Sequence, residues 1–286
     1  GFDFNKGVIK ESEHPFTLNF NNKDVRITTH YYEKNILSSI FSTIHEGGHA
    51  IYEQQIDDIV SETVLGEGTS MGIHESQSRI FENMFGRNIN FLKNIFNKFD
   101  ELFDVRSKGI EVEDFYKIVN TVSKSLIRIE ADELTYPIHI MIRYELEKEI
   151  FSNLEEIESS EYIDYLANKW ADMYEEFLGV RPTTNSEGIL QDVHWSSGLF
   201  GYFPSYALGS AYAAQIYNSM NKEFSIEENL SNGNFDNINS FLKDKIHKFG
   251  KSKTPNELLI LATGEAFNPD YYINYLKEKY RKIYGI

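Results

Sequence analysis

The chain has 286 residues, a net charge of −16 and no cysteine. Hydrophobic residues make up 41% of the chain and charged residues 25%, which is typical of a folded globular protein and argues against disorder. The acidic charge argues against binding to nucleic acid or to an anionic membrane surface, because both rest on basic patches. Without cysteine there can be no disulfide and no thiolate zinc site, so any metal must be held by histidine and carboxylate ligands.

No stretch of the sequence approaches the roughly 20 apolar residues that a membrane-crossing helix needs, and no basic-then-apolar signal segment opens the chain. These features predict a cytoplasmic protein. Because the first residue is Gly1 and not methionine, we expect that part of the natural N-terminus lies upstream.

The predicted fold is mainly α, with a short strand or hairpin region at the N-terminus. Residues 1–30 look extended, and the alternation in Val25-Arg26-Ile27-Thr28 predicts a strand there. Helical patterns dominate from about Ile36 onward. Later helices are expected at about 74–99, at 112–151 with a kink at Pro137, and at 162–178, 206–221, 238–248, 255–263 and 270–284. No internal repeat or clean domain boundary is visible, so the sequence predicts a single helical unit over residues 1–286.

The segment most indicative of function is His45-Glu46-Gly47-Gly48-His49. Two histidines four positions apart on a helix lie close together around its axis and one turn apart along it, so both can reach one Zn²⁺ while Glu46 sits beside them as a base. An apolar stripe from Ile36 to Ile51 predicts a helix with a buried face. The two glycines each weaken a helix by about 1 kcal/mol and are tolerated best where a substrate or a neighbouring element approaches the backbone. The pattern usually indicates metal-assisted hydrolysis.

A catalytic zinc ion usually takes a third protein ligand from a neighbouring element. Glu75, at the start of the next helix, is the first choice, because packing of the two helices would bring it opposite His49. His74 is the rival and Glu82 a weaker one. Glu75 could equally be a first-turn carboxylate that complements the helix dipole, so spacing alone leaves the third ligand open.

Three further segments carry recognisable patterns in chain order: Asp24-Val25-Arg26-Ile27-Thr28, Ile127-Arg128-Ile129-Glu130-Ala131-Asp132, and Gly188-Ile189-Leu190-Gln191-Asp192-Val193-His194-Trp195. They match DxRxT, IRxxAD and GxxQDxHW. Together with HEGGH at 45–49 and HESQSR at 74–79, they resemble the M32 metallocarboxypeptidases, the carboxypeptidase Taq family. The resemblance implies a long-helix, gluzincin-like metallopeptidase, with Glu75 as the third metal ligand after His45 and His49.

The resemblance also implies an activity. The expected reaction is the release of C-terminal amino acids from peptides by metal-activated water, with Glu46 as general base and Zn²⁺ as the metal, for which Co²⁺ is a substitute. The expected partners are a peptide with a free C-terminus and a second copy of the chain in a homodimer. Members of the family are longer and carry an N-terminal helical portion that this sequence is expected to lack. The alternatives are a metalloendopeptidase and an inactive metal-binding fragment without the N-terminal half of the substrate groove.

A carboxypeptidase must recognise a free α-carboxylate, which the planar fork of an arginine does best. Arg26 and Arg128 are the candidates, because the resemblance associates both motifs with the substrate cleft. Each could instead be one half of a buried ion pair, and the sequence does not decide which of them binds the carboxylate.

Other polar residues have expected roles around the reacting carbonyl. His194 and Tyr206 are the candidate donors to the developing negative charge, and Tyr202 is a weaker one. Asp132 or Asp192 could orient a zinc-bound imidazole through its second nitrogen.

Overall fold

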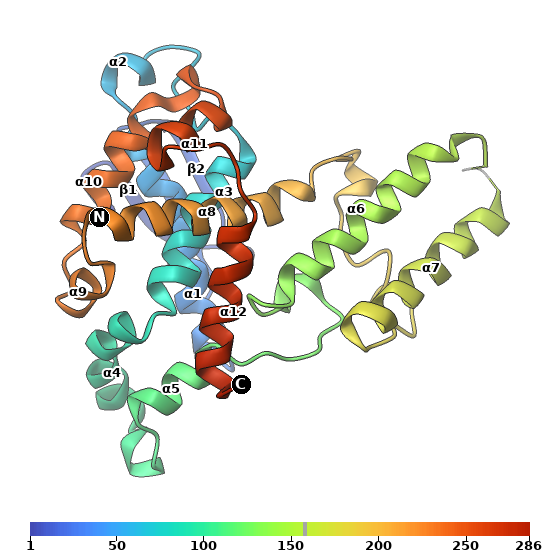
Figure 1. The fold of residues 1–286 in the computed structure, drawn as a ribbon, viewed down its shortest axis with the longest axis horizontal. Helices are drawn as coiled ribbons and strands as arrows, with labels where there is room; N and C mark the ends of the chain where they lie inside the picture. The colour runs from blue at the N-terminus through green and yellow to red at the C-terminus, as the bar shows by residue number, and fades with distance from the viewer. Residues whose placement is uncertain (157–158) are drawn as a thin grey trace. The chain divides into compact units, whose positions relative to one another are not determined.

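The computed structural model describes residues 1–156 and 159–286. Its tertiary contacts divide the chain into two compact units (Figure 1): unit 1 comprises Gly1–Val119 and Leu208–Ile286, and unit 2 comprises Asn120–Ala207. The elements are mainly helices with one small sheet, which confirms the predicted fold class. That all 286 residues fold as one unit stays a prediction. Among the residues that the structure describes, no helix combines the length and apolar character that crossing a membrane would require.

The predicted extended region forms a three-stranded sheet in unit 1, with strands β1 Gly7–Glu11, β2 Thr17–Asn21 and β3 Asp24–Thr29. The central strand β3 pairs in parallel with β1 and antiparallel with β2. Side chains alternate between the faces of a strand, so Val25 and Ile27 are buried against Ala50 of helix α1 (Ile36–Gln54), and the residue between them faces away. The sheet thereby packs along the helix that carries the HEGGH motif.

The helix expected at 74–99 is interrupted. Helix α3 covers Met71–Arg79 after the cap Ser70, a π-helical segment follows at Ile80–Gly86, and α4 runs over Ile89–Phe103. The restart at α4 has a local cause, because the Asn88 side chain accepts a hydrogen bond from the backbone N–H of Asn90.

The remaining elements of unit 1 lie before and after unit 2 in the chain. They are α2 Asp58–Ser61, a 3₁₀ turn Arg106–Lys108, α5 Val112–Val119, α8 Pro204–Glu223 (whose first residues belong to unit 2), α9 Ile226–Ser231, α10 Asp236–Lys245, a 3₁₀ segment His247–Ser252, α11 Pro255–Thr263 and α12 Asp270–Tyr284. The last two have the predicted bounds. In α11 this follows from strong end signals, a capping box between Thr254 and Glu257 and a left-handed Gly264 at the C-terminus.

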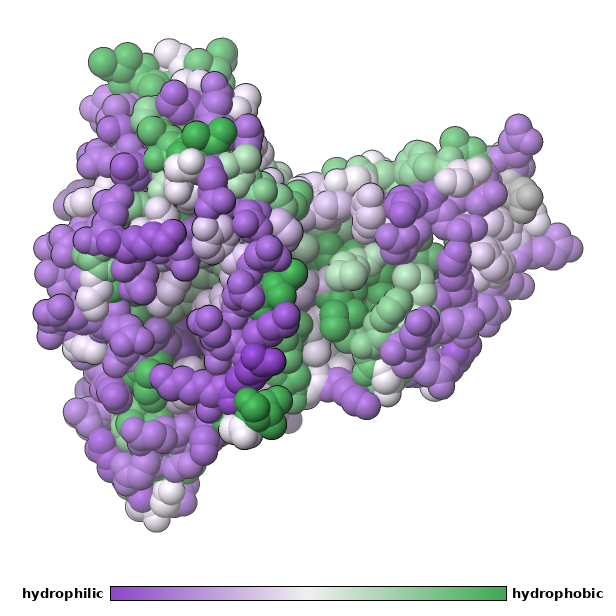
Figure 2. Space-filling model, viewed as in Figure 1, coloured by the Kyte–Doolittle hydropathy of each residue, from purple (hydrophilic) through white to green (hydrophobic). Residues whose placement is uncertain are grey.

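Unit 2 contains helices α6 Tyr136–Ser152 and α7 Ser160–Leu178, with 3₁₀ turns at Arg128–Glu130, Leu154–Glu156 and Trp195–Ser197. The two helices pack through a core that includes Leu146, Trp170 and Tyr174. Apolar surface also remains outside this core, as the green areas over α6 and α7 in Figure 2 show.

The prediction of one long helix over 112–151 is wrong. Helix α5 ends at Val119 and α6 begins at Tyr136. Pro137 does not kink a helix; it occupies the first turn of α6, where its fixed φ fits and its missing N–H leaves no bond unmade. Asp132 holds the turn just before this helix by accepting hydrogen bonds from the backbone N–H groups of Leu134 and Thr135.

Candidate metal centre

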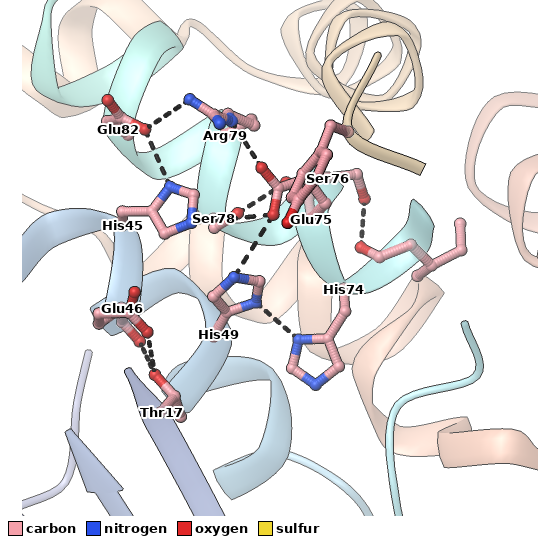
Figure 3. Close-up of polar contacts among 12 residues, drawn as sticks. Thr17, His45, Glu46, His49, His74, Glu75, Ser76, Ser78, Arg79 and Glu82 are labelled. Atoms are coloured by element: carbon pink, nitrogen blue, oxygen red, sulfur yellow. Dashed lines mark hydrogen bonds and ion pairs between the residues drawn. The ribbon is translucent and has the colours of Figure 1, made fainter. Parts of the chain in front are cut away.

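Helices α1 and α3 bring His45, His49 and Glu75 together, with one ligand atom from each residue within 4.8 Å of the others. Figure 3 shows both imidazoles turned towards the Glu75 carboxylate. Glu75 Oε2 lies 3.8 Å from His45 Nε2 and 3.6 Å from His49 Nε2. These three are the residues whose grouping the sequence predicts, and they come from two helices that are separated by residues 55–70.

Glycines allow the helices to approach closely at this point. A Cβ at Gly48 would lie 2.5 Å from the backbone oxygen of Gln77 and 2.7 Å from Ser78 Cα, so α1 can pack this tightly on α3 only without a side chain there. A Cβ at Gly209 of α8 would likewise lie 2.6 Å from Glu75 Cβ. At Gly47 a Cβ would meet nothing within 4 Å. The sequence predicts a close approach at both glycines of the motif. The structure shows it at Gly48, where helix α3 is the neighbouring element, and not at Gly47.

The donor set fits a divalent metal ion such as zinc. Zinc–ligand bonds of about 2.0–2.2 Å in tetrahedral geometry separate the ligand atoms by about 3.4 Å. The two measured separations from Glu75 Oε2 are close to that value, and two imidazoles with one carboxylate leave a fourth position for water.

His45 is oriented by Glu82 of the π-helical segment. The Nδ1 atom of His45 lies 2.9 Å from Glu82 Oε2, which also accepts a hydrogen bond of 3.2 Å from Arg79. Burial would raise the pKa of Glu82, but the charge of Arg79, the hydrogen bond from His45 and the charge of Arg87 outweigh it and hold the pKa far below its ordinary value. Since an ionised carboxylate only accepts, the hydrogen between His45 and Glu82 is on His45 Nδ1, and in the neutral imidazole the bare nitrogen is then Nε2, which faces Glu75. Burial would lower the pKa of His45, but the charge of Glu75 and the bond to Glu82 raise it overall.

His49 has a different neighbour. Its Nδ1 atom lies 2.7 Å from Nδ1 of His74, and Nε2 of His74 lies 2.6 Å from Oε1 of Glu53. Burial, followed by the nearby His74 and His45, holds the pKa of His49 well below its ordinary value, so this imidazole is neutral, as a metal ligand must be.

The expectation that Asp132 or Asp192 orients a metal-bound imidazole is wrong, because Glu82 and His74 make those contacts. Asp132 instead accepts hydrogen bonds from the backbone N–H groups of Leu134 and Thr135, just before α6, and Asp192 pairs with two arginines. Sequence reasoning considered His74 and Glu82 only as rival ligands. Their positions on the same helical segment as Glu75 were the available signal.

Glu46 lies between the two histidines in α1, and Thr17 of β2 holds its carboxylate. Thr17 Oγ1 donates to Glu46 Oε2 at 2.7 Å and lies 3.0 Å from the Glu46 carbonyl oxygen. Figure 3 shows the Glu46 carboxylate turned towards Thr17. Burial raises the pKa of Glu46, and the charge of His45 and the bond from Thr17 lower it in part, leaving it above the ordinary value. A carboxylate of this kind can accept a proton and return it near neutral pH.

Arg26 lies on the face of β3 that does not pack against α1. Its guanidinium makes a two-atom contact with Asp24, at 2.8 and 2.7 Å, and both side chains are largely exposed. It is therefore half of an ion pair, although not a buried one.

Arg128 lies in unit 2, where it makes a buried ion pair. Its Nη2 atom donates to Asp192 Oδ1 at 2.7 Å, and its Nη1 atom lies 3.1 Å from the hydroxyl of Tyr136. Arg143, which is fully buried on α6, donates through Nε to Asp192 Oδ2 at 2.7 Å. Two guanidinium groups therefore share one carboxylate. Sequence reasoning missed Arg143, although an arginine inside a strongly apolar run is a signal of a buried, paired charge.

His194 and Tyr206 also lie together in unit 2, with His194 Nε2 3.0 Å from the Tyr206 hydroxyl. The ring of Tyr202 lies 5.5 Å from that of His194. Burial, with a smaller contribution from Arg128, lowers the pKa of His194, so its imidazole is neutral. The aromatic residues singled out in the sequence thus form one cluster.

The family model of the carboxypeptidase Taq (M32) metallopeptidases matches residues 1–280. The chain belongs to this family. The membership confirms the resemblance that the sequence motifs predict.

Among M32 relatives, carboxypeptidase 1 of Bacillus subtilis strain 168 is 48% identical over 285 residues, which are 99% of this chain and 56% of the relative. Thermostable carboxypeptidase 1 of Thermus thermophilus is 41% identical over 287 residues, 100% of this chain and 55% of the relative. The crystal structure of the M32 carboxypeptidase from Deinococcus radiodurans R1 matches with a TM-score of 0.93 and 38% identity, covering 100% of this chain and 56% of the other. The chain thus spans about half the length of the M32 proteins it matches.

Proposed function

We propose that this chain carries the catalytic metal centre of a zinc-dependent metallocarboxypeptidase, which releases C-terminal amino acids from peptides. The observation that carries the proposal is the cluster of His45, His49 and Glu75, whose ligand atoms lie within 4.8 Å of one another beside the buried Glu46. Membership of a metallopeptidase family supports the same reading.

The residues around the cluster support hydrolysis. A bound zinc ion would supply Lewis-acid chemistry, lowering the pKa of a bound water and polarising a carbonyl. His45 and His49 present their Nε2 atoms to it, because their Nδ1 atoms are engaged elsewhere. Glu46 acts as general base towards the water and then delivers the proton to the departing amine, and its raised pKa suits both steps.

Arg128 is the preferred group for the substrate's terminal carboxylate. It shares Asp192 with Arg143, so the pair of arginines has one positive charge more than the carboxylate neutralises. Burial would lower the pKa of Arg128, but Tyr136 and Asp192 raise it above its ordinary value, which keeps the guanidinium charged. A charged, planar guanidinium binds a carboxylate through two parallel hydrogen bonds. Each of the two arginines already pairs with an aspartate, Arg26 with Asp24 and Arg128 with Asp192. Arg26 is the weaker candidate, because its pair is exposed, whereas Arg128 is buried beside a second arginine.

His194 and Tyr206 are proposed as the donors to the negative charge that develops on the substrate carbonyl. Their mutual hydrogen bond holds both side chains in a defined orientation, which a preorganised donor requires.

The proposal extends to the metal, the assembly and the location. Zinc is the proposed metal and cobalt its substitute, because a site of two imidazoles and one carboxylate accepts both. The proposed assembly is a homodimer, and the proposed location is the cytoplasm, which suits a chain without cysteine.

The test is hydrolysis of an N-blocked dipeptide with a free C-terminus and of the same dipeptide as its amide. The zinc-loaded chain should cleave only the free acid, and Glu46→Gln should lose roughly 10²- to 10⁴-fold in turnover while still binding zinc. Cleavage of the amide at an equal rate would favour an endopeptidase. Absence of cleavage by a zinc-loaded chain would favour an inactive metal-binding fragment.

A further inference from the structure

We propose that Glu53 and His74 are positioning residues that fix the tautomer of His49, so that its Nε2 atom is the one that faces the metal. The inference rests on the proposed metal centre. It concerns two residues outside the group of His45, His49 and Glu75.

Glu53, His74 and His49 contact one another in that order, and we call these three side chains the relay. Glu53 is its fixed end. It lies on α1, one turn after His49, and is only 3% exposed. Its Oε1 atom accepts hydrogen bonds from the backbone N–H of Gly68 at 3.0 Å and faces His74 Nε2 at 2.6 Å. Its Oε2 atom accepts from the Asn19 side-chain amide at 2.9 Å. The Glu53 carboxylate accepts from two other donors, Gly68 and Asn19, and an ionised carboxylate only accepts, so the hydrogen between Glu53 and His74 is placed on His74 Nε2.

The hydrogen on Nε2 determines the next bond. In the singly protonated form of His74, hydrogen on Nε2 leaves Nδ1 bare, so that Nδ1 is the acceptor. His74 Nδ1 lies 2.7 Å from His49 Nδ1, so His49 is the donor in that bond. His49 Nε2 is then bare, and it is the atom that lies 3.6 Å from Glu75 Oε2 (Figure 3).

The His74 ring has little freedom to turn away. The ring of Tyr52 packs against it with centroids 4.9 Å apart, and a Cβ at Gly68 would come within 2.6 Å of His74 Cδ2. His45 obtains the same tautomer directly from the Glu82 carboxylate. His49 obtains it through an intervening imidazole, which links the metal ligand to β2 and to the backbone of Gly68.

A competing pattern is chemically well defined. If both nitrogens of His74 carried hydrogen, His74 would donate to His49 Nδ1, and the His49 hydrogen would sit on Nε2. That nitrogen could not then bind a metal. The two patterns therefore differ in which nitrogen of His49 is protonated.

Nitrogen-15 NMR of the metal-free chain, labelled at histidine, distinguishes the patterns without any substitution. We expect the His49 Nδ1 signal to have the shift and one-bond proton coupling of a protonated nitrogen, and the Nε2 signal to have those of a bare one. A protonated Nε2 would overturn the inference. The readout needs neither metal nor substrate, so it stands apart from the outcome of the hydrolysis test.

Zinc affinity, measured by competition with a chromogenic chelator and zinc alone, supplies a second test. His74→Phe keeps the ring but removes the acceptor, and it should weaken zinc binding by about 10- to 100-fold, as loss of such hydrogen-bonding partners typically does. Glu53→Gln retains an acceptor for His74 and should weaken binding less. Tyr52→Phe is the matched control: it removes a buried hydrogen bond from Thr69 beside the same ring but leaves the relay intact, so affinity should be unchanged.

Folding of each variant is checked by far-UV circular dichroism before zinc is added. A folded His74→Phe variant with wild-type zinc affinity would overturn the relay. If that variant does not fold, the nitrogen-15 measurement on the unsubstituted chain decides.

Discussion

Glu75 and Glu82 lie two helical turns apart and both place a carboxylate next to His45, yet their partners give them different roles. Glu82 bonds to the outer nitrogen of His45 and to two arginines, which leaves it little freedom to move towards a metal. One oxygen of Glu75 accepts a hydrogen bond from Arg79 at 2.7 Å, and the other oxygen faces both histidines. At the scale of single residues, the surrounding hydrogen bonds decide which carboxylate is available as a ligand.

His247 gives a prediction for the pH dependence of stability. It is fully buried between the side-chain amides of Gln55 and Gln77, and burial, with a smaller effect of His74, lowers its pKa from 6.5 to about 3. Between about pH 6.5 and pH 3, His247 is protonated in the unfolded chain but neutral in the folded chain. The contribution of neutral His247 to the free energy of unfolding is therefore complete above about pH 6.5 and is lost as the pH falls towards 3.

Urea unfolding at pH 7 and at pH 5 measures this effect. The unsubstituted chain should lose about 2 kcal/mol more between the two pH values than His247→Gln, whose side chain does not titrate. Equal losses in the two proteins would show that His247 is not kept neutral in the fold.

At the scale of elements, the contact between α1 and α3 rests on Gly48. Gly48→Ala should destabilise the fold by about 1–3 kcal/mol, because the new methyl group would overlap the backbone at Gln77 and Ser78 and push the helices apart. Gly47→Ala is the matched control at the next position. With no atom near its new Cβ, it should stabilise the helix by up to about 1 kcal/mol. Denaturant unfolding checks both, and equal effects would contradict the packing described for α1.

Asp192 gives a corresponding prediction in unit 2, where it ties the loop after α7 to Arg128 and to Arg143 of α6. Asp192→Asn should destabilise the protein by about 3–5 kcal/mol, because it leaves Arg128 and Arg143 buried without their counter-charge. Asp172→Asn, which breaks an exposed pair with Arg181, should change the unfolding free energy little. If denaturant unfolding shows only a small loss of stability in Asp192→Asn, water must enter the cluster of Asp192, Arg128 and Arg143.

The elements that the sequence predicts well are those whose ends carry their own signals. Helix α11 has a capping box and a glycine end, and its bounds follow from them. The prediction of one helix over 112–151 failed because α5 ends at Val119 and a new helix begins at Tyr136, with Pro137 in its first turn. A capping residue acts through one local hydrogen bond, which an average over a long window does not detect.

At the scale of the whole molecule, metal binding should be visible in thermal stability. A metal that binds only the folded chain, at about 1,000 times its Kd, adds about 4 kcal/mol to the free energy of unfolding. Removing zinc with a chelator should therefore lower the unfolding temperature, and restoring zinc should reverse the change. In Glu75→Ala the chelator should have little effect, and an unchanged dependence on zinc in that variant would contradict the ligand set.

The site could be predicted from the sequence in so far as it depends on short motifs. His45, Glu46, His49 and Glu75 stand in two such motifs, and the family to which the chain belongs followed from five motifs in order. The partners of these residues could not be predicted, because Thr17, Glu53 and Glu82 reach the site through contacts between elements. Arg143 reaches Asp192 in the same way, across about 50 residues of chain, and no local pattern in the sequence specifies such a pair.

The central claim is that one metal ion binds to His45, His49 and Glu75. Anomalous diffraction at the zinc absorption edge, from crystals of the zinc-loaded chain, tests it most directly. We expect one strong peak within bonding distance of Nε2 of His45, Nε2 of His49 and a carboxylate oxygen of Glu75. A peak bound by His74 or Glu82 in place of Glu75, or no peak between the two histidines, would contradict it.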